Sequence, residues 1–179
     1  MLKAFNRTLL AGAVATLSLA PLAAQAAGEA KNVIFFLGDG MGPVTKTAAR
    51  IYKYKEDGSL AMDTMPYTAR IKTFSEDAAT TDSAPSMAAY MTGVKQRNEV
   101  VSMSADTVAQ SPGRDAATGV SNSVNNCAAD NGTAVPTLLE LAIAKNKATG
   151  AVATARLTHA TPAATYSHIC HRNAEYDIA

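Results

Sequence analysis

The sequence lacks an excess of positive charge. Its 179 residues hold 16 Lys and Arg and 15 Asp and Glu, which gives a formal net charge of +1 at pH 7. Nucleic-acid-binding domains gather basic residues into a patch that contacts phosphates, and helices that lie on membranes carry a basic face. Neither pattern is present. We therefore expect no nucleic-acid-specific binding and, once a leader has been removed, no membrane association.

Cysteine is scarce as well. Only Cys127 and Cys170 occur, and their spacing is not the Cys-x-x-Cys pattern of a metal site. Nothing in the sequence supports a cysteine nucleophile. In an oxidising compartment the two residues have a single possible pairing, and this favours a disulfide between them. Two alternatives remain open. Both cysteines could be free thiols, or either could bond to a cysteine in a part of the protein that this sequence does not include.

The first 26 residues have the order of a secretory signal peptide. Lys3 and Arg7 precede an uncharged apolar run over residues 8–23, and the small residues Ala24 to Ala26 follow. A membrane anchor is the alternative, but the apolar run is short and Pro21 interrupts its end. We expect a signal peptide over residues 1–26, a domain over residues 27–179, and a periplasmic or secreted protein.

The remaining chain alternates between strand-like and helix-like segments. Apolar residues 33–37 and the alternating residues 67–74 are typical of strands, and residues 151–156 predict a third. Residues 44–54, 83–93 and 135–150 have helix-compatible spacing, whereas the Ser/Asn/Asp-rich residues 100–131 predict a long surface loop. This alternation indicates an α/β fold, in which ligands gather at the carboxyl ends of parallel strands.

The first polar motif is "LGDGMG", which follows the first predicted strand. Asp39 lies between two glycines there, and its carboxylate is a hard oxygen ligand suited to Mg²⁺ or Zn²⁺. A turn aspartate that caps the next helix is the alternative. The motif is not a dinucleotide fingerprint, because Pro43 stands where the third glycine of G-x-G-x-x-G is required.

The second motif is "TTDSAPSMAAYMTG". Asp82 and Ser83 are favoured helix caps, yet Ser83 at a helix start could also attack a substrate. The hydrolase elbow G-x-S-x-G is absent, since Thr81 and Pro85 replace its glycines, and no histidine lies nearby. Activation by a metal ion is therefore the favoured route, and the helix dipole suits an anionic substrate.

The third motif is "THATPAATYSHICHRN". His159 and Thr161 are two residues apart and would point to one side of an extended segment, as the edge of a metal site. Arg172 could bind a phosphate through two parallel hydrogen bonds, or it could form a surface ion pair. For His168 and His171 we favour a solvated or core role.

These three blocks, in this order and spacing, resemble the alkaline phosphatase family. The resemblance covers residues from about Asn32 to Arg172. It implies a three-layer α/β/α fold with a largely parallel central sheet, of which this chain is the N-terminal part. It also implies hydrolysis of small-molecule phosphomonoesters by a protein that is a homodimer at full length.

The resemblance further implies a catalytic set of three residues. Ser83 corresponds to the nucleophile, which is transiently phosphorylated, and Arg172 corresponds to the group that binds the nonbridging phosphate oxygens. Asp82 corresponds to the residue that orients the arginine.

The same resemblance implies a metal set with two Zn²⁺ and one Mg²⁺ per active site. Asp39 would bridge a zinc and the magnesium, Ser83 would bind that zinc, and Thr161 would bind magnesium. His159 stands at a position where family members carry Asp or His.

The three histidines, all between His159 and His171, are too few for two zinc sites. We therefore expect this chain to be a truncated part of a longer enzyme and to be inactive alone. A non-catalytic secreted phosphate- or metal-binding fragment is the alternative. A sulfatase is disfavoured because Met87 stands where arginine is required, and a phosphodiesterase of the same fold has only weak support.

Overall fold

The computed structural model describes residues 30–179, so the predicted signal peptide lies outside the described residues. The chain divides into two compact units, Met1–Leu37 and Gly38–Ala179. In the described part of the first unit, residues 30–37 form neither helix nor strand, and all of them are exposed.

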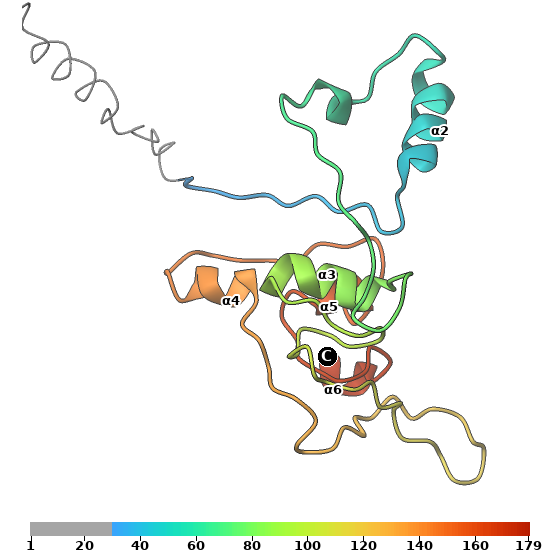
Figure 1. Ribbon diagram of the computed structural model, residues 1–179, viewed down its shortest axis with the longest axis vertical. Coiled ribbons are helices and arrows are strands. Elements are labelled where there is room, and N and C mark those ends of the chain that lie inside the picture. The colour runs from blue at the N-terminus through green and yellow to red at the C-terminus, as the bar shows by residue number, and fades with distance from the viewer. Residues whose placement is uncertain (1–29) are drawn as a thin grey trace, which may run out of the picture. The chain divides into compact units, whose positions relative to one another are not determined.

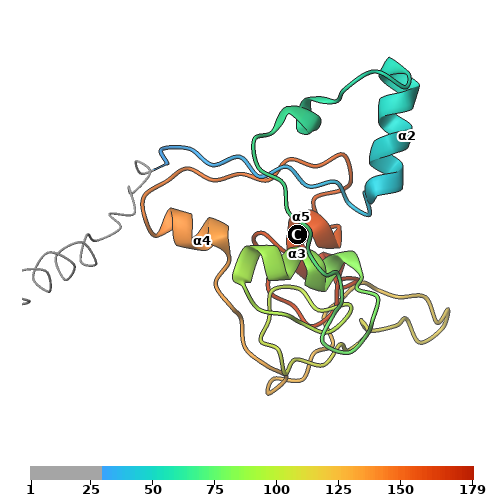
Figure 2. The ribbon, with the colours of Figure 1, turned by 45° about the horizontal axis from the view of Figure 1, so that its top comes forward.

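The second unit holds short helices joined by long irregular segments (Figure 1). Their bounds are α2 Pro43–Tyr54, the 3-10 helix η1 Ala61–Thr64, α3 Ser83–Thr92, α4 Leu138–Ile143, α5 Ala160–Ala163 and α6 Glu175–Ile178. In both ribbon views, α3 and α5 overlap near the C-terminal end of the chain (Figure 2), and α3 packs against α5 and α4.

The sequence predicts strands over residues 33–37, 67–74 and 151–156. This prediction is wrong, because none of these segments is a strand in the described residues 30–179. These segments carry no strand assignment, and pairing in the described part is limited to three isolated antiparallel bridges: Val101 with Ile169, Met103 with Ala134, and Arg114 with Ser121. A strand exists only where a neighbouring segment accepts its backbone hydrogen bonds. An apolar run without such a neighbour remains extended, so the described residues do not form the expected parallel sheet.

Helix α3 has a start and an end that its sequence specifies. The Asp82 side chain caps its N-terminus, and Gly93 ends it in the left-handed conformation, with φ 74°, that glycine adopts without steric cost. Pro85 is tolerated because it falls in the first turn, where the backbone N–H groups lack helical partners.

The core lies under α3. Met87 and Met91 of α3 are buried together with small residues of α3 and α5, and Ile169 and Ile178 join the same cluster. The alanines allow the two helices to approach closely, because a short side chain keeps the backbones near each other. This core therefore fixes both the N-terminus of α3 and the turn that contains α5.

The predicted disulfide is confirmed. Cys127 and Cys170 are bonded, and the sequence separation is 43 residues. Closing a loop of this length stabilises the folded chain by about 4 kcal/mol in the chain-entropy description. The bond ties the long loop of residues 100–131 to the segment that carries His171 and Arg172.

Candidate functional site

The site begins at the N-terminus of α3, where Asp82 is held from two directions. Its Oδ1 accepts a hydrogen bond from the Ala84 amide at 2.6 Å, and its Oδ2 accepts one from the Glu99 amide at 2.6 Å. The first bond caps the helix, so the capping interpretation is correct. The second bond fixes the remaining carboxylate oxygen, which leaves the side chain with one orientation.

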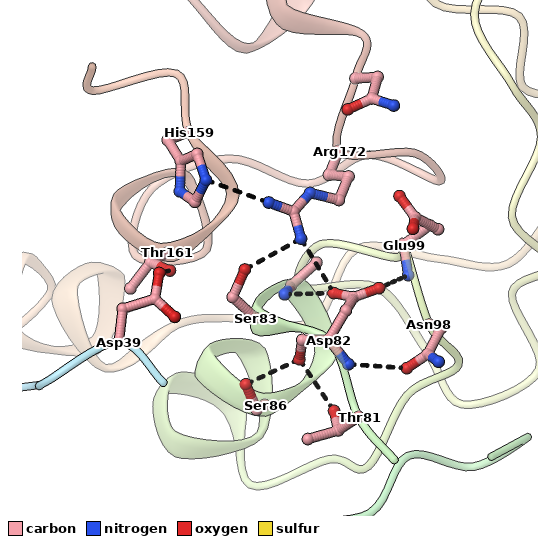
Figure 3. A network of polar contacts seen from close by, with 12 residues as sticks. Asp39, Thr81, Asp82, Ser83, Ser86, Asn98, Glu99, His159, Thr161 and Arg172 are labelled. Carbon is pink, nitrogen blue, oxygen red and sulfur yellow. Dashed lines mark hydrogen bonds and ion pairs between the residues drawn. The ribbon is translucent and has the colours of Figure 1, made fainter. Parts of the chain in front are cut away.

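Arg172 reaches this helix start from a segment 89 residues further along the chain. Its Nη1 donates to Ser83 Oγ at 2.9 Å and contacts Asp82 Oδ1 at 3.3 Å (Figure 3). The side chains of Arg172 and Asp82 are 18% and 22% exposed, so their ion pair is only partly screened by solvent. Arg172 therefore forms a partly buried ion pair, and its binding of phosphate stays a prediction.

The arrangement of Ser83, Asp82 and Arg172 can bind an anion. Ser83 is the first residue of a ten-residue helix, whose N-terminus carries a partial positive charge. The guanidinium supplies a full positive charge beside the hydroxyl. A tetrahedral oxyanion at this position would meet both groups, which is the arrangement that phosphate recognition uses.

Sequence reasoning missed the Asn98–Glu99 turn. The Asp82 amide donates to Asn98 Oδ1 at 3.0 Å, and the Glu99 carbonyl accepts from the Arg172 amide at 2.8 Å. Glu99 has a positive φ of 71°. Residue identity does not reveal this conformation in a glutamate, and the adjacent asparagine indicates only a turn.

Asp39 and Thr161 form a separate oxygen pair. Thr161 Oγ1 donates to Asp39 Oδ2 at 2.9 Å, and Asp39 is exposed. Asp39 sits on a turn that the hydrogen bond from the Met41 amide to the Gly38 carbonyl closes at 3.1 Å. Gly40 takes φ 62° in this turn, a conformation that glycine adopts freely.

The oxygen pair fits magnesium better than zinc. A carboxylate and a hydroxyl are hard oxygen ligands, and Mg²⁺ takes few protein ligands and keeps several waters. Zinc sites need three or four nitrogen, sulfur or carboxylate ligands. Across residues 30–179, no group of three or more His, Cys, Asp and Glu is arranged to hold a metal ion. The described residues therefore assemble no complete metal site, and the Asp39–Thr161 pair supplies only two oxygen ligands.

His159 faces the arginine. It stands at the N-cap position of α5, and its Nε2 lies 3.2 Å from Arg172 Nη2. An arginine only donates, so Nε2 accepts and the proton of the neutral imidazole lies on Nδ1. That Nδ1 is buried and has no hydrogen-bond partner among the described residues. A metal role for His159 stays a prediction.

The other two histidines have structural contacts. His168 Nδ1 lies 2.7 Å from the Ser102 carbonyl, and its Nε2 lies 3.0 Å from Glu140 Oε1. The Thr137 amide, and secondarily His168, lower the pKa of Glu140 by hydrogen bonding to its carboxylate. His171 is 8% exposed, and burial lowers its pKa. The expected solvated or core role thus takes two forms, since His171 is buried and His168 is partly buried in hydrogen-bonded contacts.

The chain resembles known proteins over most of its length. The family model described as alkaline phosphatase matches residues 30–179. The chain is 41% identical over 150 residues to the tissue-nonspecific alkaline phosphatase isozyme of Gallus gallus and 39% identical over 150 residues to that of Homo sapiens. Each alignment covers 80% of this chain and 26% of the relative. The chain thus spans about a quarter of the length of these curated relatives.

Solved structures give the same result. Alkaline phosphatase from the Antarctic bacterium TAB5 matches with a TM-score of 0.58 and 28% identity, over 78% of this chain and 33% of that chain. Cold-active alkaline phosphatase from Shewanella sp. matches with a TM-score of 0.56 and 26% identity, over 76% of this chain and 29% of that chain. One matching TAB5 mutant has Mg bound in its M3 site. The likeness indicates the alkaline-phosphatase-like α/β fold.

Proposed function

The chain belongs to the alkaline phosphatase family, and from that premise we propose that the protein containing it hydrolyses phosphate monoesters with Ser83 as the nucleophile. One observation carries this proposal. Arg172 donates to Ser83 Oγ at 2.9 Å and pairs with Asp82, although 89 residues separate the arginine from the serine. This long-range contact supports the proposal, because a guanidinium beside a hydroxyl at a helix start is suited to phosphate.

The first chemical step is a displacement at phosphorus. Arg172 and the N-terminus of α3 bind the nonbridging oxygens, while Asp82 keeps the guanidinium in place. The Ser83 Oγ–P bond forms as the bond from phosphorus to the ester oxygen breaks, and the serine proton passes in net terms to the departing alcohol. In the second step water attacks the phosphoserine, which releases inorganic phosphate and restores the hydroxyl. Both steps depend mainly on positioning and charge stabilisation.

A magnesium ion is the metal that the described residues suit. Asp39 and Thr161 would hold it through the carboxylate and the hydroxyl, which lie 2.9 Å apart. When bound, the ion would supply positive charge close to the reacting groups. One similar structure, a TAB5 alkaline phosphatase mutant, has Mg bound in its M3 site, which supports magnesium as the ion. The two zinc ions remain a prediction that only the family resemblance supports, and we assign them no step.

The 179-residue chain alone is proposed to be inactive. The described residues bring together too few metal ligands, and Asp39 lies on a segment without buried residues. A phosphate- or metal-binding role is the second candidate for this chain by itself, because the Arg172–Ser83 contact needs no metal.

Export and assembly are also proposals. Residues 1–26 would direct the protein to the periplasm or outside the cell, residues 27–179 would form the N-terminal part of the catalytic domain, and the full-length protein would be a homodimer. Among residues 30–179, no helix has the length and apolar character needed to cross a membrane.

The test compares substrates and chain lengths. Two proteins are purified with Zn²⁺ and Mg²⁺. One is the protein encoded by the longest reading frame that contains residues 1–179, and the other is the 179-residue chain. Each is then assayed with a chromogenic phosphate monoester, the matching phosphate diester and the matching sulfate ester. We expect the longer protein to cleave the monoester fastest and the 179-residue chain to cleave none. Preference for the diester or the sulfate ester, or no hydrolysis by the longer protein, would contradict the proposal.

A further inference from the structure

We propose that Asn98 is a positioning residue for the Asp82–Ser83–Arg172 site. The inference rests on the proposed function of that site, and it adds the turn that holds the three side chains in position. Asn98 and Glu99 form a turn that contacts the site through backbone groups and one carboxamide, and its side chains need not touch a substrate.

Asn98 is anchored on three atoms. Its Oδ1 accepts from the Asp82 amide at 3.0 Å, and its Nδ2 donates to the Thr80 carbonyl at 3.2 Å. Its own amide donates to Asp77 Oδ1 at 2.9 Å. The first two bonds bracket the peptide that leads into α3. The third bond holds the backbone of Asn98 in place, so the carboxamide is not free to follow a shifting helix start.

The following residue connects both partners of the ion pair. The Glu99 amide donates to Asp82 Oδ2 at 2.6 Å, and the Glu99 carbonyl accepts from the Arg172 amide at 2.8 Å. Glu99 has φ 71°, a left-handed conformation that is sterically unfavourable for a residue with a Cβ. Surrounding contacts must hold the residue there. The bonds of Asn98 to Asp77, Thr80 and Asp82 are such contacts.

The consequence for the site is a fixed distance between serine and arginine. Asp82 Oδ1 is shared between the Ala84 amide and Arg172, so any rotation of this carboxylate moves the guanidinium. With Glu99 bonded to the other oxygen, that rotation is blocked (Figure 3). Misplacement of a binding group by about 1 Å can lower a reaction rate about 100-fold. Loss of Asn98 should therefore weaken binding of the transition state rather than only the fold.

The test uses Asn98→Ala with a matched control, Asn131→Ala. Asn131 also makes two carboxamide bonds to backbone, since its Oδ1 accepts from the Val108 amide at 2.8 Å and its Nδ2 donates to the Val108 carbonyl at 2.7 Å. Both variants should lose similar stability. In the protein encoded by the longest reading frame, we expect Asn98→Ala to lower kcat/KM about 10- to 100-fold. The same substitution should raise the inhibition constant of inorganic phosphate. Asn131→Ala should change each by less than about threefold.

Equal kinetic effects of the two variants would overturn the proposal. If Asn98→Ala does not fold, Asp77→Ala replaces it, because the exposed Asp77 accepts the Asn98 amide bond at 2.9 Å and, besides it, a bond from the Ser75 hydroxyl at 3.0 Å. We then expect a smaller loss in the same direction, and no loss overturns the proposal.

A second readout needs no activity. Hydrogen exchange at the Glu99 amide should accelerate in Asn98→Ala and stay slow in Asn131→Ala. If the wild-type protein hydrolyses no monoester, the proposed function fails while this result still supports the turn. Unchanged exchange at Glu99 overturns the positioning role itself.

Discussion

Helices α2 and α3 have similar lengths and differ in what they bury. Helix α2, with 12 residues, has no buried residue, and no residue between Gly38 and Phe74 is buried. Helix α3, with 10 residues, buries five of them. Local sequence is enough to form both helices, but only α3 is fixed by packing. Local sequence therefore determines where a helix forms, whereas buried side chains determine whether that helix can hold a site in a fixed position.

The same division runs through the candidate site. Ser83 and Arg172 lie on elements that the buried core holds, and they form what we call the anion half together with Asp82. Asp39 and Thr161 form the metal half, in which Asp39 comes from the segment without buried residues. We expect substitutions in the two halves to have different effects.

The largest effect should follow from removing the nucleophile. Ser83→Ala in the longest reading frame should lower kcat by on the order of 10³-fold or more, because no other hydroxyl contacts Arg172 in the described residues. Ser86→Ala is the matched control. Ser86 lies on the same helix, and its hydroxyl only donates to the Asp82 carbonyl at 2.9 Å. Similar losses in both variants would place the chemistry elsewhere.

Core packing is compared next. Met87→Ala should lower the free energy of unfolding by about 2–4 kcal/mol, since Met87 is 6% exposed and its loss leaves a cavity. Ile51→Ala on α2 should cost less than about 0.5 kcal/mol, since Ile51 is 43% exposed. Urea unfolding of the 179-residue chain measures both values. Equal losses would show that α2 is packed as tightly as α3.

The geometry of the anion half is tested by Arg172→Lys. Lysine keeps the charge but cannot contact Ser83, Asp82 and phosphate through one planar group. We expect the inhibition constant of inorganic phosphate to rise about 10-fold or more. Arg156→Lys serves as the control, because Arg156 pairs with Glu175 and its side chain is 64% exposed. An unchanged constant in Arg172→Lys would mean that charge alone suffices.

The metal half is tested by Thr161→Val with Thr161→Ser as its control. Valine removes the hydroxyl that donates to Asp39 Oδ2, whereas serine keeps it. We expect the Mg²⁺ concentration for half-maximal activity to rise about 10-fold in the valine variant alone. The affinity for inorganic phosphate should change little. If phosphate affinity falls as much as Mg²⁺ affinity does, the two halves are not separable.

The smallest effect concerns pH. Hydrogen bonds from Arg156 and Thr158 lower the pKa of Glu175 from its ordinary 4.5 to about 2. A lowered folded pKa stabilises the protein above pH 4.5, and this stability is lost as the pH falls toward 2. Because Arg156 is largely exposed, solvent screening limits the effect to about 1 kcal/mol or less. Glu175→Gln should flatten the fall in unfolding free energy between pH 5 and pH 3. An unchanged slope would contradict this assignment.

Much of the site could be predicted from the sequence. Asp82 caps a helix that begins at Ser83 and has a clear end signal at Gly93, and Arg172 belongs to a motif with a recognisable spacing. The disulfide followed from there being only two cysteines. These features depend on residue identity, which a sequence states directly.

The remaining features depend on neighbours. Residues 33–37 are apolar enough for a buried strand, but a strand also needs a paired segment, and apolar composition does not supply one. The helix expected over residues 135–150 spans only Leu138–Ile143, and Asn146 takes φ 56° beyond it. The positive φ of Glu99 has the same origin, since tertiary contacts rather than its own preference hold it.

The most direct measurement is to trap the phosphorylated enzyme. The protein encoded by the longest reading frame is mixed with a phosphate monoester, and the reaction is quenched in acid. The protein is then digested, and its peptides are analysed by mass spectrometry. The account predicts one phosphoserine, at Ser83, that is absent from Ser83→Ala. Monoester hydrolysis without phosphate on Ser83, or with phosphate on another residue, would contradict the central claim.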